Sequence, residues 1–383
     1  MISVHRKVSA IKTLFALGMA GILTLSACSP ATPSSTPAPT QAPASATVPS
    51  AIANACPQKG VKELTGAGAT FPYPLYSKMF SEYNTLCGVR VNYQSIGSGG
   101  GIAQLQKRTV DFGASDGVMS DQQKQQAQGG PVLHIPIVAG AEAVIFNLPG
   151  VQRSQLKMTP DVLADIYLKK ITKWNDAKIT ALNPGVNLPN MDIAVVHRSD
   201  GSGTTFIFTN YLSKVSKEWS DKVGFATSVK WPGDIGGQGN EGVANQVKQI
   251  PGAIGYVEMA YASQNNLTWA QMRNKAGKYL DPSLEGAAQA ADVASLPDNM
   301  EIVITDSDNP NAYPITGFTW LLVYENQADA AKADAVARLA WWMTHDAQKY
   351  AAALEYAPLK GVAATKAENL VKGIKINGQP VLK

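Results

Sequence analysis

Residues 193–212 read IAVVHRSDGSGTTFIFTNYL and combine an apolar run, a glycine turn and the start of a helix. The β-branched run 193–196 is typical of a buried strand. Gly201 and Gly203 end that strand, and residues 204–212 have the pattern of a helix. Such a turn leaves backbone N–H groups unpaired at the helix N-terminus, where the helix dipole also favours anions. The stretch therefore predicts one half of an oxyanion site.

Polar side chains surround this turn and allow two interpretations. Arg198 carries a fork-shaped cation suited to oxyanions, and hydroxyl groups follow at Ser202, Thr204 and Thr205. Alternatively, a serine at this place only caps the helix, and Arg198 with Asp200 forms a surface ion pair of small energetic value. On this stretch alone capping is the simpler interpretation, so the choice depends on the rest of the chain.

Two earlier stretches repeat the order of strand, glycine turn and helix. In the first stretch, a strand is expected at 61–64, the glycine turn at 66–72 and the helix at 75–83. In the second stretch, the strand is expected at 89–93, the turn at 97–101 and the helix at 102–107. Each turn contains Ser or Thr. A short strand at 110–114 then leads to Asp116, and Asp121 is expected to cap the next helix. Three convergent helix N-termini, each with a hydroxyl group, indicate an anion site more specifically than one does.

Asp116 has an unusual place beside a predicted anion site. Its simple interpretation is a turn or cap residue. Because a carboxylate only accepts hydrogen bonds, Asp116 would instead favour an anion that still carries a proton. Phosphate keeps a proton at neutral pH and sulfate does not, so the residue predicts discrimination between these two ions.

The first 58 residues indicate export and anchoring. Residues 1–27 have a basic start and an apolar run, which is typical of a signal peptide too short to span a membrane. The sequence LSAC at 25–28 predicts lipidation of Cys28, the alternative being an ordinary signal peptide with a cysteine nearby. The uncharged Pro-, Ser- and Thr-rich residues that follow predict a tether within 28–58. Without the signal peptide and its three basic residues, the formal net charge falls from +4 to +1, which gives no reason to expect a nucleic-acid partner.

The other cysteines, Cys56 and Cys87, are expected to form a disulfide bond, because an isolated pair in an exported chain is more often bonded than free. A zinc site is not expected, because no histidine lies near either cysteine. The remaining length suffices for two α/β domains.

Several motifs resemble those of the phosphate-binding proteins that serve ABC phosphate importers. The motifs are TGAGATFP at 65–72, IGS at 96–98, VDFGASD at 110–116 and RSDGSGT at 198–204. The resemblance covers most of residues 63–330. It implies an α/β, two-lobed periplasmic-binding-protein fold of type II, with the ligand in a cleft between lobes joined by two crossings. The first lobe would comprise 59–136 and 310–383, and the second lobe 137–309.

The same resemblance implies a role for each matching residue. A phosphate ion would be held by hydroxyl groups, backbone N–H groups, one guanidinium and one carboxylate. The expected ligands are Thr70, Phe71, Ser98, Asp116, Arg198, Ser202, Gly203 and Thr204, with Asp200 as the partner of Arg198. The chain departs from the family pattern at His197 and Gly100, and residues 355–383 match it least.

The sequence thus predicts a binding protein without catalysis that carries inorganic phosphate to membrane permease subunits and their cytoplasmic ATPase. It would be exported, lipid-anchored to a bacterial membrane and monomeric, without cofactor or metal. A phosphatase or serine hydrolase using Ser202 and a receptor for another oxyanion are the alternatives.

The pattern GQGNEG at 237–242 matches a dinucleotide motif, but residues 231–235 form a poor strand, so a loop at the rim is expected. The helix expected at 329–354 places Trp341 and Trp342 in the core.

Overall fold

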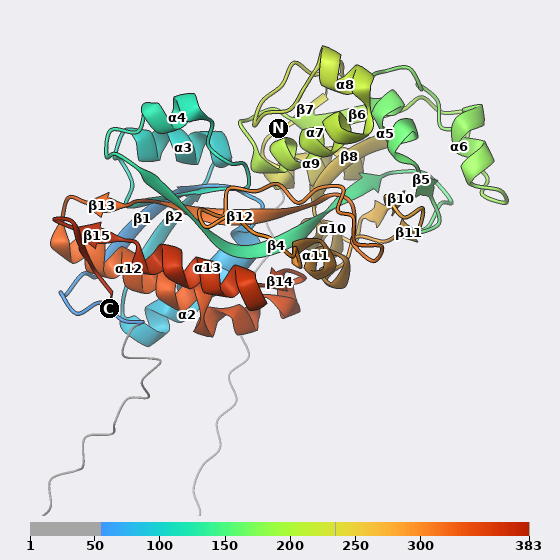
Figure 1. Ribbon diagram of the computed structural model, residues 1–383. Coiled ribbons are helices and arrows are strands. Elements are labelled where there is room, and N and C mark those ends of the chain that lie inside the picture. Colours follow the sequence, from blue (N-terminus) through green and yellow to red (C-terminus); the bar gives the residue numbers. More distant parts are fainter. Residues whose placement is uncertain (1–54, 234, 383) are drawn as a thin grey trace, which may run out of the picture. The chain divides into compact units, whose positions relative to one another are not determined.

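The computed structural model describes residues 55–233 and 235–382 (Figure 1). The predicted signal peptide at 1–27, the lipidation of Cys28 and most of the tether at 28–58 lie outside the described residues. Within the described ranges, no helix combines the length and apolar character that a membrane crossing needs.

One mixed sheet organises the described chain. Its strands follow the order β2 (Arg90–Ser95), β1 (Glu63–Gly68), β3 (Phe112–Ser115), β12 (Thr316–Tyr324), β4 (Val132–Phe146), β8 (Ala253–Glu258), β6 (Ala194–Arg198) and β7 (Ile235–Gly237). Two short strands also pair with β4, namely β9 (Thr268–Trp269) and β14 (Ala357–Pro358). Smaller sheets contain β5 (Lys157–Met158), β10 (Gln271–Arg273) and β11 (Tyr279–Leu280), and β13 (Asn326–Gln327), β15 (Lys375–Ile376) and β16 (Gln379–Pro380).

The large sheet contains two parallel groups separated by antiparallel strands. Strands β2, β1 and β3 are parallel, as are β8, β6 and β7, whereas β12 and β4 pair antiparallel between them. Strand β4 pairs with β12 up to Ala141 and then with β8 from Glu142 onward. It therefore joins the two groups. In each group the carboxyl ends of the parallel strands share one edge, which is where ligands bind in open α/β sheets.

The helices connect and cover these strands (Figure 1). Their bounds are α2 (Tyr73–Cys87), α3 (Ser98–Gln106), α4 (Asp121–Gln125), α5 (Pro160–Tyr167), α6 (Ala177–Leu182), α7 (Gly203–Val215), α8 (Lys217–Lys222), α9 (Gly239–Gln249), α10 (Met259–Gln264), α11 (Leu284–Ala291), α12 (Ala330–Thr344) and α13 (Gly361–Lys372). Helix α2 shows why they form. Its apolar side chains recur at helical spacing and are buried, and Gly88 ends it in the left-handed conformation that glycine tolerates.

Three predictions about helix ends were wrong. Helix α3 begins at Ser98, four residues before the predicted start, and therefore contains three glycines. Ser120 caps α4 in a reciprocal arrangement with Gln123, so Asp121 is the first helical residue instead of the cap. Helix α12 ends at Thr344, and two 3₁₀ helices follow, η1 (Asp346–Tyr350) and η2 (Ala352–Leu354).

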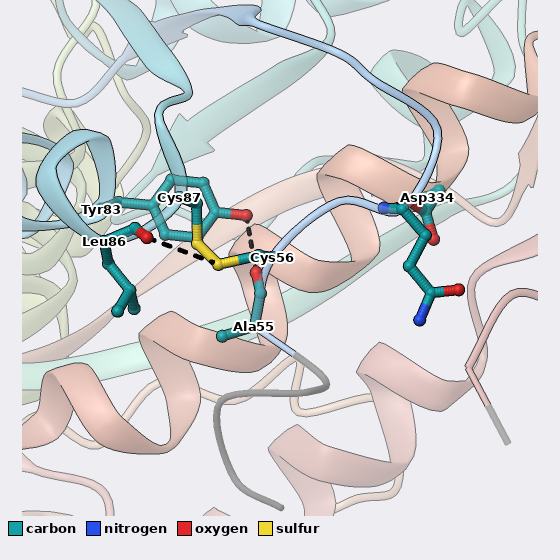
Figure 2. Close-up of a disulfide and its surroundings, with 7 residues drawn as sticks. Ala55, Cys56, Tyr83, Leu86, Cys87 and Asp334 are labelled. Atoms are coloured by element: carbon teal, nitrogen blue, oxygen red, sulfur yellow. Dashed lines mark hydrogen bonds between the residues drawn. A yellow bond between two sulfur atoms is a disulfide. The ribbon is translucent and has the colours of Figure 1, made fainter. Parts of the chain in front are cut away.

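A disulfide bond joins Cys56 to Cys87, the last residue of α2, as the sequence predicted (Figure 2). The neighbouring backbone is held as well, because the Tyr83 hydroxyl donates to the Ala55 carbonyl at 2.8 Å. The backbone N–H of Gln58 donates to Asp334 of α12 at 2.6 Å. The start of the described chain is thus fixed to two helices.

Candidate functional site

The first half of the site lies at the carboxyl ends of β1, β2 and β3. Thr70 and Phe71 follow β1, Ser98 begins α3 after a two-residue turn that follows β2, and Asp116 follows β3. The turn before Ser98 requires glycine, because Gly97 has φ +85° and a Cβ there would lie 2.3 Å from Asp200 Oδ2. The backbone N–H of Asp116 donates to the Ser98 hydroxyl at 3.2 Å, which links the second and third turns.

The second half lies where β6 gives way to α7. Arg198 ends β6 and donates to Asp200 through Nε at 2.8 Å and Nη2 at 2.5 Å, a bidentate pair that fixes the plane of the guanidinium. Ser202 caps α7, since its Oγ accepts from the backbone N–H of Thr205 at 3.0 Å. Arg198 Nη1 also donates to the Thr204 hydroxyl at 3.3 Å. The capping interpretation is therefore correct locally, whereas the expected surface ion pair is a buried one, since the Arg198 side chain is 1% exposed.

Direct contacts join the two halves. The backbone N–H of Gly99 donates to the Gly201 carbonyl at 2.9 Å. A Cβ at Gly203 would lie 2.4 Å from Asp116 Oδ2, so the first turn of α7 packs directly on the carboxylate. The structure brings the sequence-predicted residues together as one buried group: Thr70, Phe71, Ser98, Asp116, Arg198, Ser202, Gly203 and Thr204.

Asp116 is the electrostatically exceptional member of this group. Its side chain is 1% exposed, and neither carboxylate oxygen has a hydrogen-bond partner among the described residues. Burial raises the pKa of Asp116 to about 7, although the nearby Thr319 hydroxyl, Arg198 and Ser98 oppose the shift. An unpartnered buried carboxylate is costly, and either protonation or a ligand that donates to it would reduce that cost.

Asp200 shows the opposite balance. Burial raises its pKa, but the hydrogen bonds and charge of Arg198 and the backbone N–H of Gly239 outweigh burial and hold the pKa below its usual value. Asp200 is therefore an anion that balances the charge of Arg198. The guanidinium Nη1 keeps hydrogen-bonding capacity beyond this pair.

Asn240 was missed by the sequence analysis. It lies in the first turn of α9, and its Nδ2 donates to the hydroxyls of Thr70 at 2.8 Å and of Thr204 at 3.0 Å. Its Oδ1 accepts from the backbone N–H of Glu258 at 2.9 Å. Because both threonine oxygens already accept hydrogen bonds, their hydroxyl hydrogens remain free to donate to an anion.

The signal that could have found Asn240 is the GQGNEG pattern at 237–242. Its interpretation as a rim loop was wrong, because β7 precedes it and α9 begins within it. The pattern is thus another turn from strand to helix of the kind already recognised. Strand β7 contains two glycines among its three residues, which is why the apolar pattern of a strand is absent.

Among the described residues, the contacts of the histidines are with groups other than Ser202. The two ring nitrogens of His197 lie 2.9 and 3.1 Å from the carbonyl oxygens of Arg198 and Gly233, and the ring stacks on Trp231. His134 contacts Met119 and Glu301, and His345 contacts Trp341. No His, Cys, Asp or Glu side chains of the described ranges form a group that could hold a metal ion.

Comparison with known proteins decides the family. A model described as a PBP superfamily domain matches residues 37–347. The phosphate-binding protein PstS of Xylella fastidiosa is 45% identical over 355 residues, which cover 92% of this chain and 93% of the relative. The chain belongs to the PstS family of the PBP superfamily. The family resemblance inferred from the motifs is thereby confirmed.

Other comparisons agree with membership of the PstS family. The phosphate-binding protein PstS of Pasteurella multocida is 47% identical over 298 residues, covering 77% of this chain and 86% of the relative. The crystal structure of a phosphate binding protein from Stenotrophomonas maltophilia aligns with a TM-score of 0.62 at 19% identity, covering 81% of this chain and 94% of that one. The likeness confirms the predicted periplasmic-binding-protein fold.

Proposed function

We propose that this chain binds inorganic phosphate outside the cytoplasmic membrane and delivers it to an ABC phosphate import permease. The observation that carries the proposal is the unpartnered, buried carboxylate of Asp116 among hydrogen-bond donors. Such a site suits an oxyanion that still carries a proton, because the ion accepts from every donor and donates to the one acceptor. The names of the PstS relatives, all phosphate-binding proteins, support the same ligand.

Each residue of the site has a proposed part. Thr70, Ser98, Ser202 and Thr204 give hydroxyl groups, and Phe71, Ser98, Gly203 and Thr204 give backbone N–H groups. Arg198 gives a charge-assisted bond through its guanidinium, which Asp200 holds in place. Asp116 accepts the proton of the ion. In this scheme the protein binds phosphate and performs no catalysis.

We further propose a delivery role with lipid anchoring at Cys28, reached through a signal peptide at 1–27 and a tether at 28–58. The two lobes would comprise 59–136 with 310–383, and 137–309. The monomeric protein would present these lobes to the transmembrane permease, whose cytoplasmic ATPase drives import. Replacing Cys28 by Ser should release the protein from membranes, and a variant that stays membrane-bound would contradict the anchor.

Calorimetric titration of the purified protein with phosphate, arsenate and sulfate tests the function. We expect tight binding of phosphate and arsenate, whose ions carry a proton, and no measurable binding of sulfate. Incubation with a chromogenic phosphate ester should release no product above the uncatalysed rate. If the protein preferred sulfate, its ligand would be another oxyanion instead of phosphate. If it hydrolysed the ester and Ser202→Ala abolished the hydrolysis, its role would be catalysis instead of binding.

A further inference from the structure

Two buried glutamates lie opposite each other beside the anion site. Glu142 of β4 and Glu258 of β8 are register partners in the antiparallel pairing, and both side chains are 0% exposed. Directly opposed side chains on neighbouring strands point to the same face with about 5 Å between their Cβ atoms. Two ionised carboxylates in this position would repel each other strongly, and each would also lose its hydration.

The face that carries this pair is the one that faces the site. Gly140 and Glu142 share it, because side chains alternate along a strand. A Cβ at Gly140 would lie 2.7 Å from the Phe71 ring and 3.4 Å from Glu258 Oε1. On β8, Tyr256 shares the face of Glu258, and its hydroxyl bonds with the Thr205 hydroxyl of α7 at 2.7 Å. The pair therefore lies between the Phe71 turn and the first turns of α7.

Hydrogen bonds satisfy only part of the pair. Glu258 Oε2 accepts from the backbone N–H of Ala260 at 2.9 Å and lies 2.9 Å from the Tyr356 hydroxyl, whose single hydrogen also has the Phe71 carbonyl at 2.7 Å as an acceptor. Glu258 Oε1 and both oxygens of Glu142 have no hydrogen-bond partner among the described residues. Burying oxygens without hydrogen-bond partners costs far less free energy for a neutral carboxylic acid than for a carboxylate.

The charges around the pair oppose ionisation. Burial raises the pKa of both carboxyl groups well above their usual value, and the charge of Asp116 adds to this for both. Arg198 opposes the rise in pKa for Glu142, and the hydrogen bonds of Tyr356 and Ala260 oppose it for Glu258. The positive charge of Arg198 is already balanced by Asp200 at 2.5 Å. The titratable and charged groups around Glu142 are Asp116 after β3, Arg198 of β6, Tyr256 and Glu258 of β8, Tyr167 of α5 and Tyr313 before β12. Those around Glu258 also include Tyr261 of α10, Glu355 after η2 and Tyr356 before β14.

We propose that Glu142 is a further residue of the anion site, a neutral carboxyl group that must keep its proton, together with Glu258, for the anion to bind. The inference rests on the proposed phosphate-binding function. A phosphate dianion beside Asp116 tolerates a neutral pair, but an ionised Glu142 adds a like charge where no water screens it. Phosphate affinity therefore decreases once the pair loses a proton.

The variant Glu142→Gln keeps the shape of the side chain and cannot ionise, so it separates charge from packing. Calorimetry in steps from about pH 8 upward compares conditions in which phosphate is mostly the dianion. We expect the native affinity to fall with rising pH at least about threefold more than that of Glu142→Gln, which has lost one ionisable carboxyl group of the pair and keeps Glu258. Glu82→Gln removes an exposed carboxylate of α2 and should retain the native pH profile.

Infrared spectroscopy gives a second readout that does not depend on binding. At about pH 8 the native protein should show the carbonyl band of a protonated carboxylic acid, and Glu142→Gln should lose intensity there. Glu258→Gln serves the same comparison if Glu142→Gln does not fold. The inference would be overturned if the affinities of the native protein and of Glu142→Gln fell in parallel, if the native affinity did not change with pH, or if the band were absent. Failure of the native protein to bind phosphate at about pH 8 would instead overturn the proposed function.

Discussion

In the proposed site, Asp116 would introduce selectivity, because the other members of the group donate hydrogen bonds. Sulfate would bring a bare oxygen against its carboxylate in a desolvated site, and an unpaired buried charge of this kind costs several kcal/mol. In Asp116→Asn we expect phosphate affinity to fall modestly and sulfate binding to appear, because the amide can donate. Paired calorimetric titrations at one pH and ionic strength measure this. A variant that rejects sulfate as firmly as the native protein would assign the discrimination to donor geometry.

The raised pKa of Asp116 also predicts a pH dependence of stability. The folded protein keeps the Asp116 proton up to about pH 7, whereas the unfolded chain loses it near the usual pKa of 3.8. Stability from this group is therefore present at low pH and is lost as pH rises through the folded pKa, by about 4 kcal/mol at most. Unliganded Asp116→Asn should lack this loss. Melting temperatures of both proteins between about pH 4 and pH 8 should therefore diverge, and parallel curves would contradict the shift.

Arg198 has the guanidinium that the proposed site uses, and its side chain is 1% exposed. Charge-assisted hydrogen bonds in a dry site are among the strongest available, whereas exposed arginines contribute little. We expect Arg198→Ala to weaken phosphate binding at least tenfold, about 1.4 kcal/mol or more. Asp200→Asn should weaken it less, because Asp200 contacts the arginine instead of the ligand. Calorimetry that found native affinity in Arg198→Ala would refute the arrangement proposed for the site.

Among the secondary-structure elements, the N-terminus of α9 joins both halves of the site through Asn240. Asn240→Ala removes the amide that joins the hydroxyls of Thr70 and Thr204 and leaves the Glu258 N–H without its acceptor, whereas the backbone N–H of residue 240 and Arg198 Nη1 still donate to these two hydroxyls. We expect phosphate affinity to fall about tenfold, mostly through faster release. Stopped-flow measurement of dissociation checks this. Asn183→Ala is the matched control, since Asn183 is also buried but binds the backbone of Lys157. Equal effects of the two variants would indicate a general loss of stability.

The same elements show what the sequence could predict. Glycine turns after apolar runs are local signals, so the turns at Thr70, Ser98 and Ser202 were recognisable, and a family resemblance supplied their common ligand. The start of α3 was missed because Gly99, Gly100 and Gly101 disfavour a helix interior. The packing explains these glycines, most clearly Gly101, since a Cβ there would lie 2.4 Å from the Cα of Gly68, and a Cβ at Gly99 would lie 3.0 Å from the Cα of Gly201. Such contacts between distant segments, including Asn240 with Thr70 and Glu142 with Glu258, leave no local pattern.

For the folded chain as a whole, the Cys56–Cys87 bond fixes the beginning of the described chain to α2, and Gln58 adds a contact with Asp334 of α12. A bridge over a separation of 31 residues limits the freedom of the unfolded chain, which corresponds to about 3 kcal/mol. Replacing both cysteines by Ser should therefore lower the free energy of unfolding by about that amount. Phosphate affinity should stay unchanged, because neither cysteine contacts the residues of the site. Denaturant titration of the native and doubly substituted proteins measures the first effect and calorimetry the second.

A stabilising disulfide bond would be contradicted if the two proteins had equal free energies of unfolding. It would also be contradicted if the mass of the unreduced native chain showed two free thiols. A loss of affinity in the double variant would instead show that the constraint extends through α2 to the Thr70 turn that precedes it.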